Sequence, residues 1–186
     1  MQIVSTEIAD VKIVTPVRHG DGRGFFSEIF REDALAQHGI AVGFVQENHS
    51  FSAAQGVVRG LHFQTPPAAQ AKLVRVAAGA ILDVAVDIRA GSRSFGRHVA
   101  VVLSADLGNQ LFVPEGFAHG FCTLVPDTHV LYKVNRYYSA EHDGGVLWND
   151  PALGIDWPVP ADGAVLSDKD RRQPLLADLP PVFRYT

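Results

Sequence analysis

Residues 59–64 read Arg-Gly-Leu-His-Phe-Gln and combine the residue types that a proton-transfer or ligand-binding site uses. Successive side chains of a strand point to opposite faces. Arg59 is therefore expected on one face, and His62 and Gln64 on the other. Imidazole titrates near neutral pH, which makes His62 a candidate general base. A polar His-x-Gln face lines a polar cavity or faces solvent, and this motif alone leaves both possibilities open.

His119 and Lys72 are two further candidates in apolar strands. His119 follows a turn that contains Pro114 and Gly116. This spacing predicts that His119 lies just inside the mouth of a barrel; the alternative is a histidine with satisfied hydrogen bonds at a strand end. Lys72 begins a strand whose next same-face residues are valines. A lysine on an otherwise apolar face indicates a functional role.

Other polar residues interrupt apolar strands or stand beside them. Asp83 and Asp87 lie within a valine-rich run, where a charge is costly unless it is paired or faces a wet cavity. A solvated outer face is the alternative. Tyr132 is a strand residue, and residues 137–138 are two tyrosines whose rings could stack on a ligand. Residues 166–170 read Leu-Ser-Asp-Lys-Asp, a charge cluster that is typical of a solvated turn.

Strands must position most of these residues. Short runs rich in Val, Ile and Phe recur about every ten residues, which favours a β-sandwich or barrel. The predicted strands are 11–17, 25–30, 43–50, 57–63, 72–77, 81–88, 98–103, 110–113, 118–124 and 129–135. One short helix is predicted near 31–38, with Gly39 as its left-handed cap. Strands do not alternate with helices, which excludes a doubly wound sheet. The prediction is an all-β fold.

The chain after Asp150 is rich in proline and irregular. We interpret residues 151–186 as a wrapping tail whose apolar residues pack on the core. The residues expected to do so are Leu153, Ile155, Trp157, Leu166 and Leu175. A chain of 186 residues and 20.1 kDa suits one domain, so a single domain over 1–186 is predicted.

Composition excludes several classes of protein. Hydrophobic residues make up 47% and charged residues 19% of the chain, which is ordinary globular usage. The net charge of −4 argues against a nucleic-acid binder. The one cysteine, Cys122, cannot form an internal disulfide, which favours a reducing compartment. No apolar run approaches the ~20 residues of a membrane span, and the first residues lack the pattern of a signal peptide. A soluble, cytoplasmic protein without a membrane partner is predicted.

Taken in order, these motifs resemble the dTDP-4-dehydrorhamnose 3,5-epimerase family of the cupin superfamily. The matching segments lie at 21–26, 46–50, 59–64, 72–75, 83–87, 114–121, 132–133, 137–138, 148–151 and 166–170. The resemblance implies a cupin-type jelly-roll β-barrel, a homodimer and no cofactor. It also implies a substrate, dTDP-4-dehydro-6-deoxy-D-glucose, whose C3 and C5 are inverted to give dTDP-4-dehydro-L-rhamnose on the route to dTDP-rhamnose.

The resemblance also implies four catalytic roles. A carbon next to a ketone is a weak acid, so its deprotonation needs a base and an electrophile at the ketone oxygen. In the family pattern His62 is the base and Asp170 holds its other nitrogen. Lys72 places a positive charge beside the enolate oxygen. Tyr132 delivers a proton to the opposite face of the sugar, for which a phenol that is protonated at neutral pH is suited.

The remaining family positions bind the nucleotide sugar. Arg23, Arg59 and His119 address the diphosphate or nearby sugar, and arginine matches phosphate geometry with paired donors. The other positions contact the thymine base, the deoxyribose or the sugar: Phe26, Glu28, Gln46, Glu47, Asn48, Tyr138, Asp143 and Lys169. Asp143 stands where the family often has Glu, so the charge is kept with a shorter reach. The partner subunit is expected to supply some of the N-terminal contacts.

Three other functions share part of this residue pattern. A metal-dependent cupin needs several histidines and a carboxylate, but Gln64 stands where a second histidine would follow His62. No metal ligand set is therefore expected. A non-catalytic nucleotide-sugar module would keep Arg23, Arg59 and Tyr138 without a base and an acid. An enzyme that inverts only C5 or only C3 of another deoxysugar would keep the same four catalytic residues.

Overall fold

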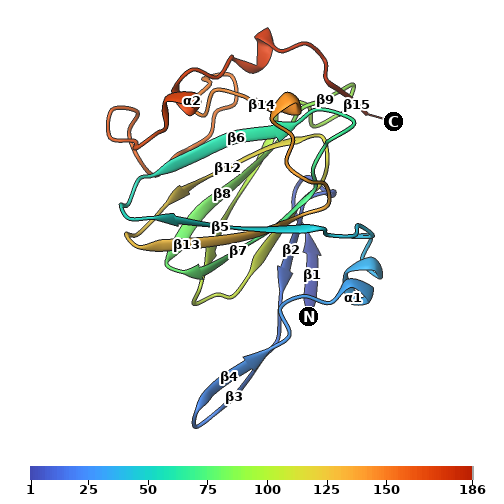
Figure 1. The fold of residues 1–186 in the computed structure, drawn as a ribbon, viewed down its shortest axis with the longest axis vertical. Helices are drawn as coiled ribbons and strands as arrows, with labels where there is room; N and C mark the ends of the chain where they lie inside the picture. Colours follow the sequence, from blue (N-terminus) through green and yellow to red (C-terminus); the bar gives the residue numbers. More distant parts are fainter. Residues whose placement is uncertain (186) are drawn as a thin grey trace.

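Two antiparallel sheets form a β-sandwich in the computed structural model, which describes residues 1–185 (Figure 1). The six-stranded sheet runs, in spatial order, β1 (Gln2–Ser5), β2 (Lys12–Thr15), β11 (Gln110–Val113), β7 (Lys72–Ala78), β13 (Thr128–Val134) and β5 (Gln46–Ser52). The five-stranded sheet runs β10 (His98–Ser104), β8 (Ala80–Asp87), β12 (Phe117–Thr123), β6 (Val58–Gln64) and β14 (Asp143–Gly145). From β5 to β8 the chain passes from one sheet to the other with each strand, as in a jelly roll. The predicted all-β class is confirmed.

Short elements complete the fold. Strands β3 (Arg18–Asp21) and β4 (Gly24–Ser27) form a hairpin that extends away from the sandwich (Figure 1). Strands β9 (Arg89–Ala90) and β15 (Phe183–Arg184) pair in parallel. The helices are α1 (Glu32–Ala36), α2 (Asp168–Arg171) and two 3₁₀ turns, Ala140–His142 and Leu176–Asp178. Within residues 1–185, none of these helices has the length and apolar character that a membrane crossing requires.

The apolar core lies between the two sheets. Val74 and Leu111 of the six-stranded sheet pack with Ile81, Leu103 and Phe117 of the five-stranded sheet, and each of these side chains is at most 2% exposed. Inward-facing side chains alternate with outward-facing ones along each strand, which explains why the sequence alternates. The polar residues that interrupt this alternation lie beyond the core, between β5, β13 and β7 on one side and β6 and β12 on the other.

The chain after β14 packs against the outer face of the five-stranded sheet, and Figure 1 shows it lying over β6. Leu153, Ile155 and Trp157 contact the cluster formed by strand residues such as Leu61 and Val84. Leu166 packs in a neighbouring cluster with Trp148. These four predicted packing residues are therefore correct. The fifth, Leu175, is wrong, because its side chain is 37% exposed and Leu176 packs in its place.

Each of the ten predicted strands overlaps an observed strand, and 110–113 coincides with β11. The helix predicted over 31–38 is observed as Glu32–Ala36, and Gly39 adopts the left-handed conformation with φ of 79°. Strands β1, β3, β9, β14 and β15 and helix α2 were not predicted. They contain two to four residues each, which is too short for a periodic pattern.

The prediction that Arg59 and His62 lie on opposite faces of β6 is wrong. His62 pairs with His119 of β12, whereas Arg59 pairs with Phe121, so two residues of β6, Gly60 and Leu61, lie opposite one residue of β12. This β-bulge lies at Gly60, whose φ of 132° is accessible to glycine. A bulge re-aims the side chains on either side of it. Arg59 consequently lines the same cavity as His62 instead of the opposite face.

Candidate active site

His62 and Asp170 form a hydrogen-bonded pair at the centre of the site. The distance between His62 Nε2 and Asp170 Oδ1 is 2.5 Å. His62 comes from β6, while Asp170 lies on α2, 108 residues further along the chain. Ser167 caps α2 by accepting a hydrogen bond from the Asp170 backbone N–H at 3.1 Å, and its hydroxyl donates to Asp170 Oδ2 at 2.9 Å. Two independent contacts therefore fix the carboxylate behind the imidazole.

The environment of Asp170 keeps it ionised. Burial acts to raise the pKa of this carboxyl, but hydrogen bonds from His62 and Ser167 and the nearby charge of Lys169 lower the pKa below its usual value. An ionised Asp170 accepts the Nε2 proton of His62. Nδ1 of His62 has no hydrogen-bond partner within residues 1–185 and carries the lone pair of that tautomer. The imidazole is therefore positioned to act as a base through Nδ1.

Lys72 lies on β7, beside the His62 imidazole, and is 8% exposed. Its Nζ is 3.4 Å from the backbone oxygen of His62. Burial lowers the pKa of Lys72 to about 8, an effect that the negative charges of Asp83 and Asp143 partly offset and the positive charge of Lys169 reinforces. Lys72 thus supplies a cation in a poorly solvated place, where its field acts strongly on a developing oxyanion.

Tyr132 faces the cavity from β13, in the sheet opposite to the one that carries His62. Its ring packs against the main core cluster, and the phenol is partly buried. Burial raises the pKa of the Tyr132 phenol above its ordinary value. The hydroxyl is therefore protonated at neutral pH and is available as an acid on the side of the cavity away from β6.

His119 forms a second buried pair, with Asp83. His119 Nε2 is 2.8 Å from Asp83 Oδ1, and the two residues are 6% and 0% exposed. Burial lowers the pKa of the His119 imidazole, although the adjacent Asp83 acts in the opposite direction. Asp83 therefore faces the interior and is paired with His119. The alternative, that Asp83 lies on a solvated outer face, is excluded.

Two neighbouring cavities of about 250 and 190 Å³ contain these groups. His62, Lys72, Tyr132 and Lys169 line both of them. The larger cavity is also lined by Ser50, Arg59, His119, Phe121, Ser167 and Asp170. The smaller one is also lined by Gln46, Asn48, Phe63, Gln64, Gln70, Tyr138 and Asp143.

The mouth of the smaller cavity carries a polar cluster. Asp143 Oδ2 accepts hydrogen bonds from Lys169 Nζ and from the Tyr138 hydroxyl, the latter at 3.3 Å. Gln46 Nε2 donates to Asn48 Oδ1 at 2.8 Å. The shorter reach of aspartate at position 143 is thus sufficient to join the lysine and the tyrosine.

Four predicted binding residues lie outside both cavities in this chain. Arg23 and Phe26 belong to the β3–β4 hairpin, where the Arg23 side chain is 91% exposed and Phe26 is 72% exposed. Glu28 follows the hairpin and is exposed. Glu47 lies on the outward face of β5, where it pairs with Lys133 at 3.0 Å.

Sequence reasoning missed Ser50, Gln70 and Ser167 as cavity residues. The signal for Ser50 was available, because it continues the alternating polar face of Gln46 and Asn48 on β5. Ser167 caps a helix of four residues, which no periodic pattern predicts. Within residues 1–185, no cluster of three or more His, Cys, Asp or Glu side chains is arranged to hold a metal ion.

The arrangement combines a base, an acid from the opposite sheet and a cation in one cavity. Such a set removes a proton from a carbon acid, stabilises the resulting oxyanion and returns a proton from another direction. Fold and site together define a cupin-type proton-transfer enzyme. A profile described as dTDP-4-dehydrorhamnose 3,5-epimerase matches residues 5–178. The chain belongs to this family of isomerases.

Known epimerases are similar to this chain over almost its whole length. A dTDP-4-dehydrorhamnose 3,5-epimerase of Sinorhizobium fredii is 54% identical over 185 residues, covering 100% of this chain and 94% of that protein. A crystal structure of the Bacillus anthracis enzyme with TDP and PPi bound has a TM-score of 0.91 at 53% identity, covering 94% and 98% of the two chains. A Legionella pneumophila 3,5-epimerase in complex with dTDP-4-keto-L-rhamnose has a TM-score of 0.94 at 42% identity, covering 100% and 98%.

Proposed function

We propose that this chain inverts C3 and C5 of dTDP-4-dehydro-6-deoxy-D-glucose and produces dTDP-4-dehydro-L-rhamnose, for dTDP-rhamnose synthesis. The observation that carries this proposal is the convergence of the His62–Asp170 pair, Lys72 and Tyr132 on one cavity. The L. pneumophila relative, whose crystal contains dTDP-4-keto-L-rhamnose, supports the choice of sugar.

The proposed reaction is a proton exchange through an enolate. His62 Nδ1 takes the proton from the carbon beside the C4 ketone, and the electron pair of that C–H bond moves to the ketone oxygen. Lys72 stabilises the negative oxygen, and Asp170 stabilises the imidazolium. The Tyr132 hydroxyl then donates its proton to the opposite face of the carbon. Proton exchange with solvent restores the phenol and the neutral imidazole, and the cycle repeats at the second carbon.

The nucleotide is proposed to occupy the remaining walls of the two cavities. Arg59 and His119 are positioned for the diphosphate or the adjacent sugar in the larger cavity, while Gln46, Asn48 and Tyr138 lie in the smaller cavity and are assigned to the nucleoside. Asp143 lines the smaller cavity and is bonded to Lys169, which lines both cavities. The reaction as written needs no redox step, and no cofactor is proposed.

The same proposal places the enzyme in the cytoplasm as a homodimer and treats residues 1–186 as one domain. The free, buried Cys122 is compatible with a reducing compartment. The exposed hairpin that carries Phe25 and Phe26, which are 61% and 72% exposed, is compatible with insertion into a second copy. In such a dimer, Arg23, Phe26 and Glu28 complete the site of the partner.

The experiment that tests this function is proton NMR of the purified enzyme with dTDP-4-keto-6-deoxyglucose in deuterated water. The proposal expects deuterium at both C3 and C5 and a product with the L configuration. Exchange and inversion at a single carbon would assign the chain to the C3-only or C5-only alternative. Binding of the nucleotide sugar without any exchange would identify a non-catalytic module.

Arg59→Lys is expected to weaken dTDP binding by about tenfold, because lysine keeps the charge but loses the paired donors. Arg59 Nε and Nη2 are held by Ser52 Oγ at 3.2 Å and by the Phe51 backbone oxygen at 2.9 Å, so the guanidinium is oriented before the ligand arrives. Calorimetric titration with dTDP measures the effect, and Arg31→Lys, at the N-cap of α1, is the matched control. Unchanged dTDP affinity in Arg59→Lys would contradict the assignment.

Turnover is expected to fall as the pH rises above about 8, because the Lys72 ammonium, whose pKa is lowered to about 8, then loses its proton. Loss of the cation removes stabilisation of the enolate, so the rate should decrease about tenfold per further pH unit. Lys72→Arg should move this decrease above pH ~10, since guanidinium keeps its proton. The measurement is kcat between pH 6 and 10.5. A flat wild-type profile would show that the charge of Lys72 is not used.

Complementation tests the contribution of the partner subunit. Arg23→Gln and His62→Asn should each abolish most activity alone, while co-expression should restore about a quarter of it. Half of the dimers are then mixed, and each mixed dimer of two-fold symmetry contains one site with both His62 and the partner's Arg23. No restoration in mixed dimers would show that Arg23 acts within its own chain or not at all.

A further inference from the structure

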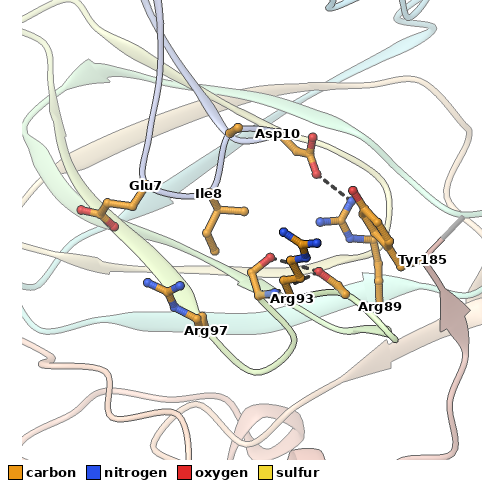
Figure 2. A pocket seen from close by; sticks show the side chains of 10 residues that line it. Glu7, Ile8, Asp10, Arg89, Arg93, Arg97 and Tyr185 are labelled. Atoms are coloured by element: carbon orange, nitrogen blue, oxygen red, sulfur yellow. Dashed lines mark hydrogen bonds and ion pairs between the residues drawn. The ribbon is translucent and has the colours of Figure 1, made fainter.

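A cavity of about 460 Å³ lies apart from the active site and shares no lining residue with the two active-site cavities. Three separate segments form it: residues 7–10 between β1 and β2, residues 89–97 after β8, and Tyr185 near the end of the chain. Figure 2 shows their side chains around the hollow. Arg89, Arg93 and Arg97 are among its ten lining residues.

Arg89 forms the fixed wall of this cavity. Its Nε and Nη2 donate to the two carboxylate oxygens of Asp87 at 2.9 and 2.8 Å, and its Nη1 donates to Asp10 at 2.9 Å. The guanidinium carbon lies 4.5 Å from the centre of the Phe117 ring and 5.0 Å from that of Tyr185. The one positive charge of Arg89 thus faces two carboxylates, and two aromatic rings also contact its guanidinium.

The loop that carries the other two arginines is also held in place. The hydroxyls of Ser92 and Ser94 donate to Asp87 Oδ2 at 2.6 and 2.7 Å. Backbone hydrogen bonds join Asp87 N to Arg97 O at 3.0 Å and Gly96 N to Asp87 O at 2.8 Å. A ligand therefore meets an ordered backbone, which reduces the entropic cost of binding.

Arg93 and Arg97 carry charges that no ion pair balances. Neither forms an ion pair with a carboxylate anywhere in residues 1–185. Both belong to the lining of the hollow. Glu7, which Figure 2 shows on the same side as Arg97, is the one lining carboxylate without an ion pair within residues 1–185. The ten lining residues include three arginines and two carboxylates and thus carry a net charge of +1, although the whole chain has a net charge of −4.

We propose that this cavity is a second binding site, for a small phosphate-bearing anion, and that Arg93 and Arg97 are its main ligands. Guanidinium groups bind phosphate oxygens through paired, charge-assisted hydrogen bonds. Two guanidiniums on one ordered loop can hold two phosphate groups or two edges of one. The cavity volume of about 460 Å³ is sufficient for a diphosphate group and a small substituent.

The test is a calorimetric titration of the full-length protein with inorganic pyrophosphate in the presence of saturating dTDP, which occupies the active site. We expect saturable binding of one pyrophosphate per chain under these conditions. A parallel titration with inorganic phosphate shows whether one phosphate group is sufficient. Absence of pyrophosphate binding would overturn the proposal. If dTDP itself fails to bind, the proposed function is wrong, while titration without dTDP still reports on the second site.

Variants connect the binding to this cavity. Arg93→Gln/Arg97→Gln should weaken pyrophosphate binding at least about tenfold while leaving epimerisation unchanged. Glu7→Gln should strengthen it, because it removes the opposing carboxylate. The control Lys12→Gln/Arg31→Gln makes the same change in net charge away from the cavity and should leave the affinity unchanged. Equal weakening in both double variants would indicate a general charge effect and reject the site.

Discussion

The Tyr132→Phe variant is expected to exchange substrate hydrogens with solvent without inverting the carbon that carries them. Its His62–Asp170 pair and Lys72 still form the enolate, but the phenol that faces the cavity from β13 is gone. The proton therefore returns from the imidazole to the face that it left. In deuterated water, deuterium should enter C3 or C5 of recovered substrate, and product of inverted configuration should decrease by about 10²–10⁴-fold.

The phenylalanine ring keeps the packing of Tyr132 against the core cluster, so folding should be preserved. Tyr137→Phe is the matched control, because Tyr137 is 71% exposed and lines neither active-site cavity. It should behave as wild type in the same NMR assay. Inversion at full rate by Tyr132→Phe would mean that another group supplies the proton, and Tyr132 would then serve only as part of the wall.

His62→Asn is expected to lower turnover by about 10²–10⁴-fold and to abolish exchange of substrate hydrogens with solvent. Asparagine has no basic nitrogen to accept a proton, and its side chain is too short to place a donor where Nε2 of His62 meets Asp170. Affinity for dTDP should change little, because the nucleotide is assigned to other walls of the cavities. Rate and exchange are measured together by NMR.

The control for this substitution is His38→Asn, at the exposed end of the α1 segment. It changes the same residue type without touching either cavity. Because His62 is the only proposed base for both carbons, exchange at C3 and at C5 should disappear together. Near-normal turnover in His62→Asn, or loss of exchange at one carbon alone, would reject His62 as the sole base.

Local patterns were sufficient to predict ten of the fifteen strands in residues 1–185 and the inward face of Lys72. Alternation with Val74 and Val76 places Lys72 inside, and all three residues are buried. Arg59 was placed on the wrong face because a β-bulge depends on pairing with β12, and one strand's sequence does not show its partner. Pairing between neighbouring strands of one sheet, and not propensity, decides such positions.

The pairing of His62 with Asp170 could not be predicted from spacing. It joins positions that are 108 residues apart. The contact depends on the path of the tail, which packs along the outside of the five-stranded sheet and carries Asp170 to His62. The family resemblance supplied this pair. The resemblance also supplied Arg23 and Phe26. In a single chain these two side chains are simply exposed, because the ligand that they are expected to bind lies in another subunit.

The location of Asp170 on the tail has a consequence for local opening of the protein. A segment that packs on the outside of a domain can detach in a sub-global fluctuation while the sheets remain intact. Each such opening separates Asp170 from His62. While the segment is detached, the His62 imidazole is no longer oriented by the carboxylate. We therefore expect activity to be coupled to an unfolding equilibrium of the C-terminal segment. Conditions that loosen this segment should reduce turnover before they change the β-sheet circular dichroism signal.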